Sequence, residues 1–305
     1  MSELQPFFHD GNLRVRIPCG KVRWIDFLTY SRLLNSREGG WDFKSTRKGG
    51  GLQRWKADGL ERLVEADFIE FVEQWTGNSL KNPKAYPRPR PNDFRLGRDF
   101  TNDRKRAAAS CDPNKIGTCS ENSLNARLFQ NHGVFPSGET MTCGTNPFSG
   151  PLLGYEVPLC DDSDGQLKID LLACDQITRQ LEIIELKQAS NANNSPLMAL
   201  IEGICYGLQL WRCRVEFSKE SRDTAKRLED SRFELKLDDF KTLQLTIAAP
   251  RDYWKSWGCT DNEAKTVMGQ MEQILAAVNR QTKKLRGPEL KLSTFCIIDE
   301  GQLPR

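Results

Sequence analysis

The sequence predicts an α/β fold over residues 107–305, with helices flanking a central mixed sheet, preceded by an α+β amino-terminal module and linker over residues 1–106. Past residue 115, apolar positions recur at helical and strand-like spacings in the order helix, three strands, helix, strand. Residues 77–106 contain four prolines among many basic residues, which is typical of a boundary. Charge also changes along the chain: residues 1–110 hold 21 Lys and Arg against 14 Asp and Glu, whereas the remainder holds 23 against 27.

The amino-terminal module is expected to contain two strands and a helix. A hairpin is predicted over LRVRIPCGKVRWIDFL, because two alternating runs flank the turn-forming segment PCGK. A glycine-rich loop with Arg47 and Lys48 follows. Residues 52–75 then show helical periodicity, and we expect their apolar stripe to pack in a core.

The linker presents arginines in a proline-rich setting. Arg88 and Arg90 alternate with prolines in the run PRPRP, which favours an extended and stiff segment. Guanidinium groups bind phosphate oxygens well, so Arg47, Lys48, Arg88 and Arg90 are expected to contact nucleic acid. A solvated linker with ordinary surface charge is the alternative explanation.

The elements of the second domain follow one another clearly. SENSLNARLFQNHG predicts a helix with Ser120 as its N-cap, and LLGYEVPLC predicts a strand. Two more strands are predicted in QLKIDLLACD and QLEIIELKQA, joined by a short polar turn at 175–179. NSPLMALIEGICYGLQLWR predicts a helix, followed by a strand at 242–250, a long helix near 261–285 and a last strand in LKLSTFCIID.

Three charged residues stand out on the paired strands. Fourteen residues separate Asp170 from Glu185, and Lys187 lies two positions after Glu185. Because side chains alternate along a strand, Glu185 and Lys187 share one side, and a hairpin would bring Asp170 beside them. Such a charged group at one end of an apolar sheet is costly without a partner, and a divalent cation would offset this cost. An ion-pair set at a solvent-facing sheet edge is the alternative.

This spacing, on two adjacent apolar strands with helices before and after, resembles the PD-(D/E)XK nuclease superfamily, which has the restriction-endonuclease-like fold. The resemblance covers about residues 115–250 and rests on Asp170, on the triplet Glu185-Leu186-Lys187, and on the order of elements. Ile169 stands where the signature has a proline, which is a common variation.

The resemblance implies Mg²⁺-dependent hydrolysis of phosphodiester bonds, with Mn²⁺ able to substitute. Asp170 and Glu185 would be the carboxylate ligands, aided by the Leu186 carbonyl, for a cation that activates water and polarises the phosphoryl oxygen. Lys187 would orient the attacking water and stabilise developing charge. Glu121 matches the acidic residue that many members carry on the preceding helix, and would complete the metal shell. Its alternative role is that of a carboxylate favoured by the helix dipole.

Three further residues are expected at the edge of this site. Glu202 and Tyr206 are four residues apart on one face of a predicted helix, where the RecB-like branch of the superfamily has a glutamine and a tyrosine. Glu202 departs from that pattern. Tyr206 is expected either to contact a phosphate or to pack in the core, and Gln188 directly follows the triplet.

Composition suggests a cytoplasmic protein. The start lacks the features of a signal peptide, and no apolar run approaches the roughly 18 to 20 residues of a membrane span. The ten cysteines include no CxxC pair, so reduced thiols are expected rather than disulfides or a zinc site. We expect DNA and no membrane as partners, with a homodimer or a larger complex left open.

These observations predict a DNA nuclease, with an endonuclease expected although the motif does not separate endo- from exonucleolytic cleavage. A role in restriction or anti-phage defence follows only by analogy with other stand-alone nucleases of this fold. The alternatives are a catalytically silent nucleic-acid-binding or scaffold module of the same fold and an RNA-directed nuclease.

Overall fold

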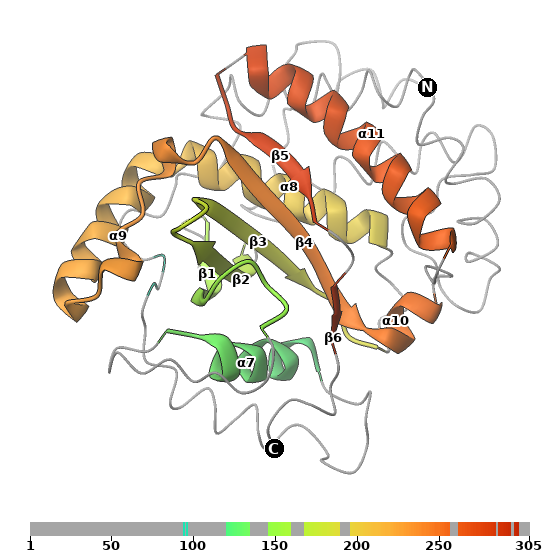
Figure 1. Ribbon diagram of the computed structural model, residues 1–305, viewed down its shortest axis with the longest axis horizontal. Helices are drawn as coiled ribbons and strands as arrows, with labels where there is room; N and C mark the ends of the chain where they lie inside the picture. The colour runs from blue at the N-terminus through green and yellow to red at the C-terminus, as the bar shows by residue number, and fades with distance from the viewer. Residues whose placement is uncertain are drawn as a thin grey trace, which may run out of the picture.

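The protein is described by a computed structural model, which covers residues 94, 96, 120–134, 146–159, 168–189, 196–256, 262–284, 286–293 and 296–298. The predicted amino-terminal module, with Arg47, Lys48, Arg88 and Arg90, lies outside the described residues. The predicted α/β character of the second domain is confirmed, because helices flank a mixed sheet (Figure 1).

The described residues form a sheet of six strands. β1, β2 and β3 form an antiparallel meander, β4 lies parallel to β3, and both β5 and β6 lie parallel to β4. β3 and β4 are therefore central strands, and their burial on both faces explains their nearly continuous apolar runs. The strands are β1 (Leu152–Pro158), β2 (Lys168–Asp175), β3 (Gln180–Leu186), β4 (Thr242–Pro250), β5 (Glu289–Leu292) and β6 (Cys296–Ile298).

Within the described ranges, five α-helices accompany the sheet. α8 packs against β3 and β4, α7 contacts β1, and α11 lies beside β5 (Figure 1). Short 3₁₀ turns connect α9 to β4. The helices are α7 (Glu121–His132), α8 (Pro196–Arg212), α9 (Arg214–Leu228), α10 (Arg251–Ser256) and α11 (Asn262–Lys284), and the 3₁₀ turns are η3 (Ser231–Phe233) and η4 (Leu237–Asp239).

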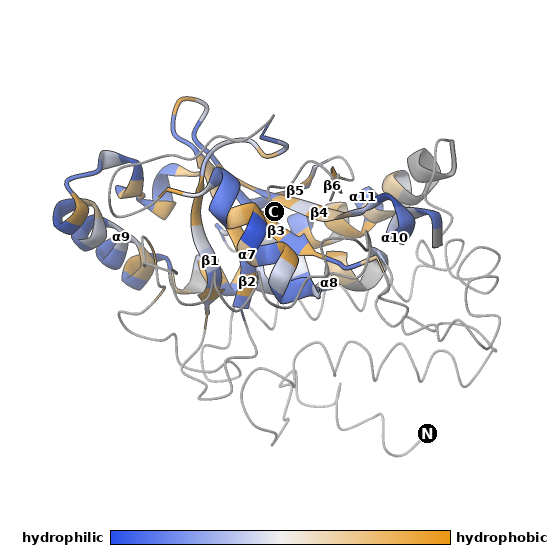
Figure 2. Ribbon diagram, turned by 90° about the horizontal axis from the view of Figure 1, so that it is seen from below, coloured by the Kyte–Doolittle hydropathy of each residue, from blue (hydrophilic) through white to orange (hydrophobic). Residues whose placement is uncertain are grey.

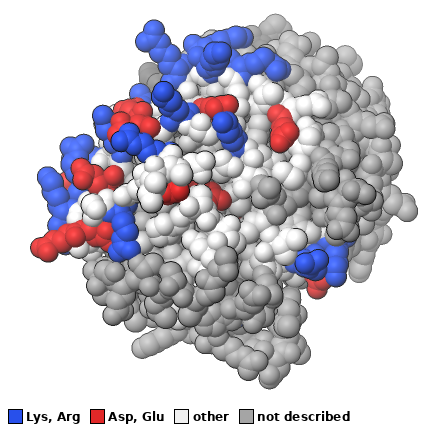
Figure 3. Space-filling view, in the orientation of Figure 1, with Lys and Arg blue, Asp and Glu red and all other residues white. Residues whose placement is uncertain are grey.

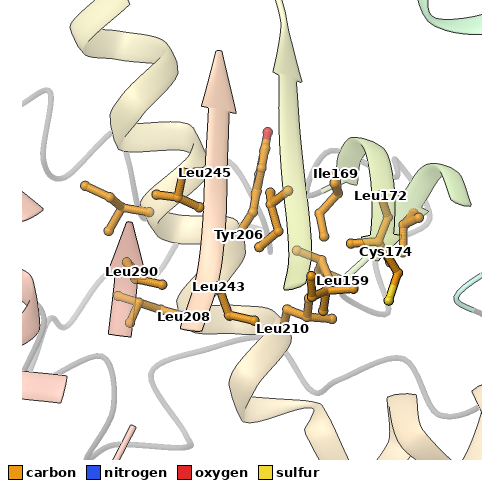
Figure 4. Packing of buried hydrophobic residues seen from close by; sticks show 14 of the residues in the cluster. Leu159, Ile169, Leu172, Cys174, Tyr206, Leu208, Leu210, Leu243, Leu245 and Leu290 are labelled. Atoms are coloured by element: carbon orange, nitrogen blue, oxygen red, sulfur yellow. The ribbon is translucent and has the colours of Figure 1, made fainter. Parts of the chain in front are cut away.

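Alternating side chains of β3 divide the core into two clusters. Leu181 and Ile183 join the larger cluster with α8, whereas Ile184 and Leu186 join the smaller cluster with α7. Figure 4 shows part of the larger cluster between the sheet and α8. Figure 2 shows polar and apolar residues mixed along α9, and the side chains that this helix buries are Phe217, Ser218, Ser221, Thr224 and Ala225.

The start of α7 confirms the predicted cap. Ser120 has an extended backbone, and its hydroxyl accepts a hydrogen bond from the Ser123 N–H at 3.2 Å. This bond satisfies one of the backbone donors left free by the first turn of the helix. α7 therefore begins at Glu121, whose carboxylate is placed in the first turn.

The prediction of a single last strand is wrong. The run LKLSTFCIID forms two short strands, because β5 pairs with the first half of β4 and β6 with the second half. Leu245 lies opposite Leu292, but Ala248 lies opposite Cys296, so the later chain contains one extra residue relative to β4. One inserted residue interrupts the ladder and reverses which side chains face the core.

Two residues of the predicted linker are part of the core. The Phe94 ring is fully buried and packs edge-on against Phe217 of α9, with 5.2 Å between ring centroids. The Phe94 N–H donates to both carboxylate oxygens of Glu220, at 2.7 and 2.8 Å. Leu96 is also buried in the larger cluster. The core of the second domain therefore uses residues that precede position 107, while the boundary itself stays a prediction.

Two further features are the membrane-spanning capacity of the described helices and the state of the described cysteines. Within the described ranges, no helix combines the length and the apolar character needed to cross a membrane. Cys174, Cys213 and Cys296 carry free thiols.

Candidate functional site

Asp170 and Glu185 lie side by side where β2 and β3 meet. The antiparallel pairing begins with Leu171 opposite Ile184, and one further step of this register places Asp170 opposite Glu185. The Asp170 Oδ2 atom accepts a hydrogen bond from the Leu186 N–H at 2.8 Å. This carboxylate thus occupies the place of a backbone acceptor and ties the start of β2 to the end of β3.

Lys187 lies directly after β3 and is buried among carboxylates. Its side chain is only 1% exposed, and its ammonium forms an ion pair with Glu185. The Nζ atom also lies 2.9 Å from Oε2 of Glu202, a residue of α8, which packs against β3 and β4. The backbone N–H of Lys187 donates to the Ala248 carbonyl at 3.0 Å, which fixes this residue against β4.

The carboxylates of the site have raised pKa values. Burial is the main cause of the increase in the pKa of Asp170 to about 7, and Glu121 adds to it, whereas Lys187 and the Leu186 N–H act in the opposite direction. Burial likewise raises the pKa of Glu185 well above its usual range, with Asp170 as the next contribution. Part of the Asp170 side chain reaches solvent, so the site is not fully enclosed.

The same carboxylates also change the pKa values of the Lys187 ammonium and the Tyr206 phenol. Burial lowers the pKa of Lys187, but the surrounding carboxylates, Glu185 first and Glu202 second, outweigh this effect and hold it well above the ordinary value. The pKa of Tyr206 is also raised, first by burial and then by the same two carboxylates. Both directions favour the ammonium form of Lys187 and the neutral hydroxyl of Tyr206.

Comparisons with protein-family models, with curated proteins and with solved structures find no match. The meaning of the site must therefore come from its own geometry and chemistry.

The residues predicted to form the site do come together. Asp170, Glu185 and Lys187 meet at the ends of neighbouring strands, and Glu121 at the start of α7 is close enough to raise the pKa of Asp170. Gln188 follows Lys187 and is half-buried, so its role stays a prediction. The alternative of an ion-pair set at a solvent-facing sheet edge agrees with the structure in part: Lys187 does pair with Glu185, but β2 and β3 are interior strands and Lys187 is buried.

Glu202 and Tyr206 lie deeper than predicted. Glu202 is 4% exposed and contacts the Lys187 ammonium, so it lies inside the charged group rather than at its edge. The ring of Tyr206 packs in the larger hydrophobic cluster, which agrees with the prediction of core packing for this residue. Figure 4 shows its hydroxyl pointing along the strands toward their carboxyl ends, on the side where Glu185 and Lys187 follow.

Sequence reasoning overlooked a third buried carboxylate, besides Glu185 and Glu202. Glu182 of β3 is 2% exposed and faces the smaller cluster, where it accepts hydrogen bonds from the Thr246 hydroxyl and, at 2.7 Å, from the Ser149 N–H. Its three-residue separation from Glu185 was the available signal, since an odd spacing along a strand places two side chains on opposite faces. Glu182 joins β3, β4 and the loop before β1, away from Lys187.

The donor set suits a hard divalent cation in part. Asp170 and Glu185 offer neighbouring carboxylates, and Glu185 Oε2 is buried without a hydrogen-bond donor among the described residues. In the described part of the chain, no group of three or more His, Cys, Asp or Glu side chains is arranged to hold a metal ion, so Glu121 does not complete a preassembled three-carboxylate set. Magnesium commonly takes one or two protein carboxylates and keeps several waters, and two are present here.

The face of the described residues that Figure 3 shows is not uniformly basic. In Figure 3, acidic and basic side chains are mixed over α9, and Lys and Arg gather near the carboxyl end of α11, where Lys283 and Lys284 lie. The middle of this face is largely uncharged, with a few acidic atoms. Attraction to a polyanion would therefore depend on contributions beyond this face.

Proposed function

We propose that this protein is a Mg²⁺-dependent nuclease that hydrolyses phosphodiester bonds of DNA. One observation carries the proposal: neighbouring strands bring the half-buried carboxylate of Asp170 and the buried carboxylate of Glu185 to the buried Lys187, whose ammonium pairs with Glu185. Two acids with raised pKa values around a fixed cation, partly open to solvent, form an arrangement typical of catalytic rather than structural sites.

The topology supports the finer assignment to a restriction-endonuclease-like core of the PD-(D/E)XK type. A helix precedes three antiparallel strands, a second helix crosses the sheet, and a fourth strand returns parallel to the third. The acidic residues lie on the second and third strands, with the lysine two positions after the last acid. The fold supports this assignment only together with these residues.

Each residue of the site has a proposed role. A divalent cation, when bound, would supply Lewis-acid activation of water and of the phosphoryl oxygen. Asp170 and Glu185 would hold that ion, the Leu186 carbonyl is a further oxygen donor, and Glu121 would act at the outer edge. Lys187 would donate hydrogen bonds to the attacking water or to the phosphate, in a position fixed by its backbone bond to β4.

The basic residues outside the described ranges are the proposed contacts to DNA. Arg47, Lys48, Arg88 and Arg90 suit phosphate binding because their groups fork or point onto phosphate oxygens. An endonuclease acting in the cytoplasm in restriction or anti-phage defence, alone, as a homodimer or in a larger complex, is the setting we propose by analogy.

Cleavage assays test this proposal directly. Purified protein is incubated with plasmid and with linear DNA in Mg²⁺, in Mn²⁺ and in EDTA, beside Asp170→Asn, Lys187→Met and the exposed-residue control Lys283→Met. We expect cleavage that requires the cation, a loss on the order of 100-fold or more in the two site variants, and retention in the control. Equal cleavage by wild type, Asp170→Asn and Lys187→Met would sink the proposal.

One observation favours a catalytically silent module as the second candidate. Lys187 already forms ion pairs with Glu185 and Glu202, so the described site has an internal cation that partly neutralises its acids. DNA binding that survives in EDTA, combined with no cleavage in any metal, would favour this candidate. Labelled RNA and DNA compared in the same assay would reveal an RNA-directed nuclease.

A further inference from the structure

Glu202 is the least expected member of the charged group. α8, which packs against β3 and β4, carries Glu202, and the Glu202 Oε2 atom lies 2.9 Å from the Lys187 Nζ atom. Both side chains are almost completely buried, at 1% exposed for Lys187 and 6% for Glu202. An ammonium removed from water to this extent needs a counter-charge, because an unpaired buried cation is strongly destabilising.

Lys187 has two such counter-charges, and only one of them belongs to the proposed cation site. Glu185 pairs with Lys187 through Oε1, while its Oε2 atom has no hydrogen-bond donor among the described residues. A divalent cation held by Glu185 would draw on the same negative charge and would repel the nearby ammonium. Lys187 would then leave its position unless a second carboxylate retained it.

The charges of the buried group support this division of roles. Asp170, Glu185 and Glu202 bring three negative charges when ionised, against the single positive charge of Lys187. One divalent cation would balance the charge of these four side chains, with Glu121 outside this count at the edge of the site. With an uncharged side chain at position 202, Lys187 and the cation would share only the two carboxylates of Asp170 and Glu185.

We propose that Glu202 is a positioning residue, which holds the Lys187 ammonium in place when Glu185 turns its charge toward a divalent cation. This inference rests on the proposed function for its catalytic meaning, but the holding contact is testable by itself. A purely structural ion pair would contribute equally with and without metal. A positioning contact would matter more when the metal is bound, since Glu202 is then the main partner of Lys187.

The test is a double-mutant cycle measured by thermal unfolding, in EDTA and again in Mn²⁺. The variants are Glu202→Gln, Lys187→Met and the double variant, with Glu272→Gln as the matched control on the exposed side of α11. We expect the two changes to be non-additive in Tm by a few °C in EDTA and by a clearly larger amount in Mn²⁺. A coupling that is absent, or that is the same in both conditions, would overturn the inference.

Cleavage measurements separate this inference from the proposed function. Increased coupling in Mn²⁺ without any nuclease activity would leave the positioning role standing and refute the nuclease. Nuclease activity with unchanged coupling would do the reverse. If Lys187→Met does not fold, kinetics decide: Glu202→Gln is expected to lower kcat by about 10- to 100-fold at unchanged KM for DNA, and Glu202→Asp to recover part of it. Wild-type kcat in Glu202→Gln would overturn the inference.

Discussion

Replacement of Asp170 by asparagine should change how stability depends on pH. The pKa of Asp170 is raised from 3.8 to about 7, mainly by burial, so the folded protein binds this proton more tightly than the unfolded chain. The corresponding stabilisation is complete below about pH 4 and disappears as the pH rises through 7. At 1.36 kcal/mol per pH unit the shift amounts to ~4 kcal/mol, an upper limit because solvent reaches part of this side chain.

Asparagine keeps the acceptor for the Leu186 N–H but has no proton to lose. Between pH 5 and 8 in EDTA, the wild type should therefore lose roughly 2–3 kcal/mol relative to Asp170→Asn, which corresponds to about 5–10 °C in Tm. Thermal or urea unfolding across this range measures the difference, and Asp223→Asn on the exposed side of α9 controls for net charge. Parallel pH curves for wild type and Asp170→Asn would refute the reasoning.

Three further predictions concern packing and thiols. Phe94→Ala should destabilise the domain by about 3–5 kcal/mol, because it leaves a cavity in a buried position against Phe217. Ile177→Ala at an exposed turn should change the free energy of unfolding little. Equal unfolding midpoints for the two variants would contradict this prediction. Gly150→Ala should be destabilising, since a Cβ at this position would lie 2.2 Å from the Cys174 carbonyl oxygen. Gly269→Ala in α11 should instead stabilise the protein by about 0.5–1 kcal/mol, since a Cβ there would meet no neighbouring atom within 4 Å. Unfolding midpoints that shift in the same direction in both variants would argue against this pair of predictions. Desolvation raises the pKa of the buried Cys174 and of the half-buried Cys296 to about 12, so iodoacetamide at pH 8 should label both more slowly in the folded than in the unfolded protein. Peptide mapping measures the rates, and equal rates in the two states would contradict the prediction.

The order of elements was predictable because each has a strong local pattern. Short apolar runs bounded by polar turns identified β2 and β3, and the three- and four-residue spacing of apolar side chains identified α8 and the long helix α11. α9 was not predicted, because its sequence RVEFSKESRDTAKRL is dominated by charge and buries few side chains, Phe217 and Ala225 among them. The division of the last strand depends on pairing with β4, which no local pattern contains.

The site was predictable to the extent that it lies on one hairpin. Strand alternation places Glu185 and Lys187 together, and the hairpin register adds Asp170. The contact between Lys187 and Glu202 crosses from the sheet to a helix, so it depends on the packing of α8 and not on sequence spacing. The burial of Phe94 was missed for the same reason, since its partners on α9 lie more than 120 residues later.

The anchoring of Phe94 has a consequence for the arginines before it. Arg88 and Arg90 lie at most six residues from a backbone position that is hydrogen-bonded to Glu220, and six residues of chain span about 20 Å at full extension. Confinement within that radius corresponds to an effective concentration on the order of 50 mM next to the domain. If those guanidinium groups bind a nucleic acid, even a weak contact would hold the bound strand near α9, whose Glu220 anchors the Phe94 backbone.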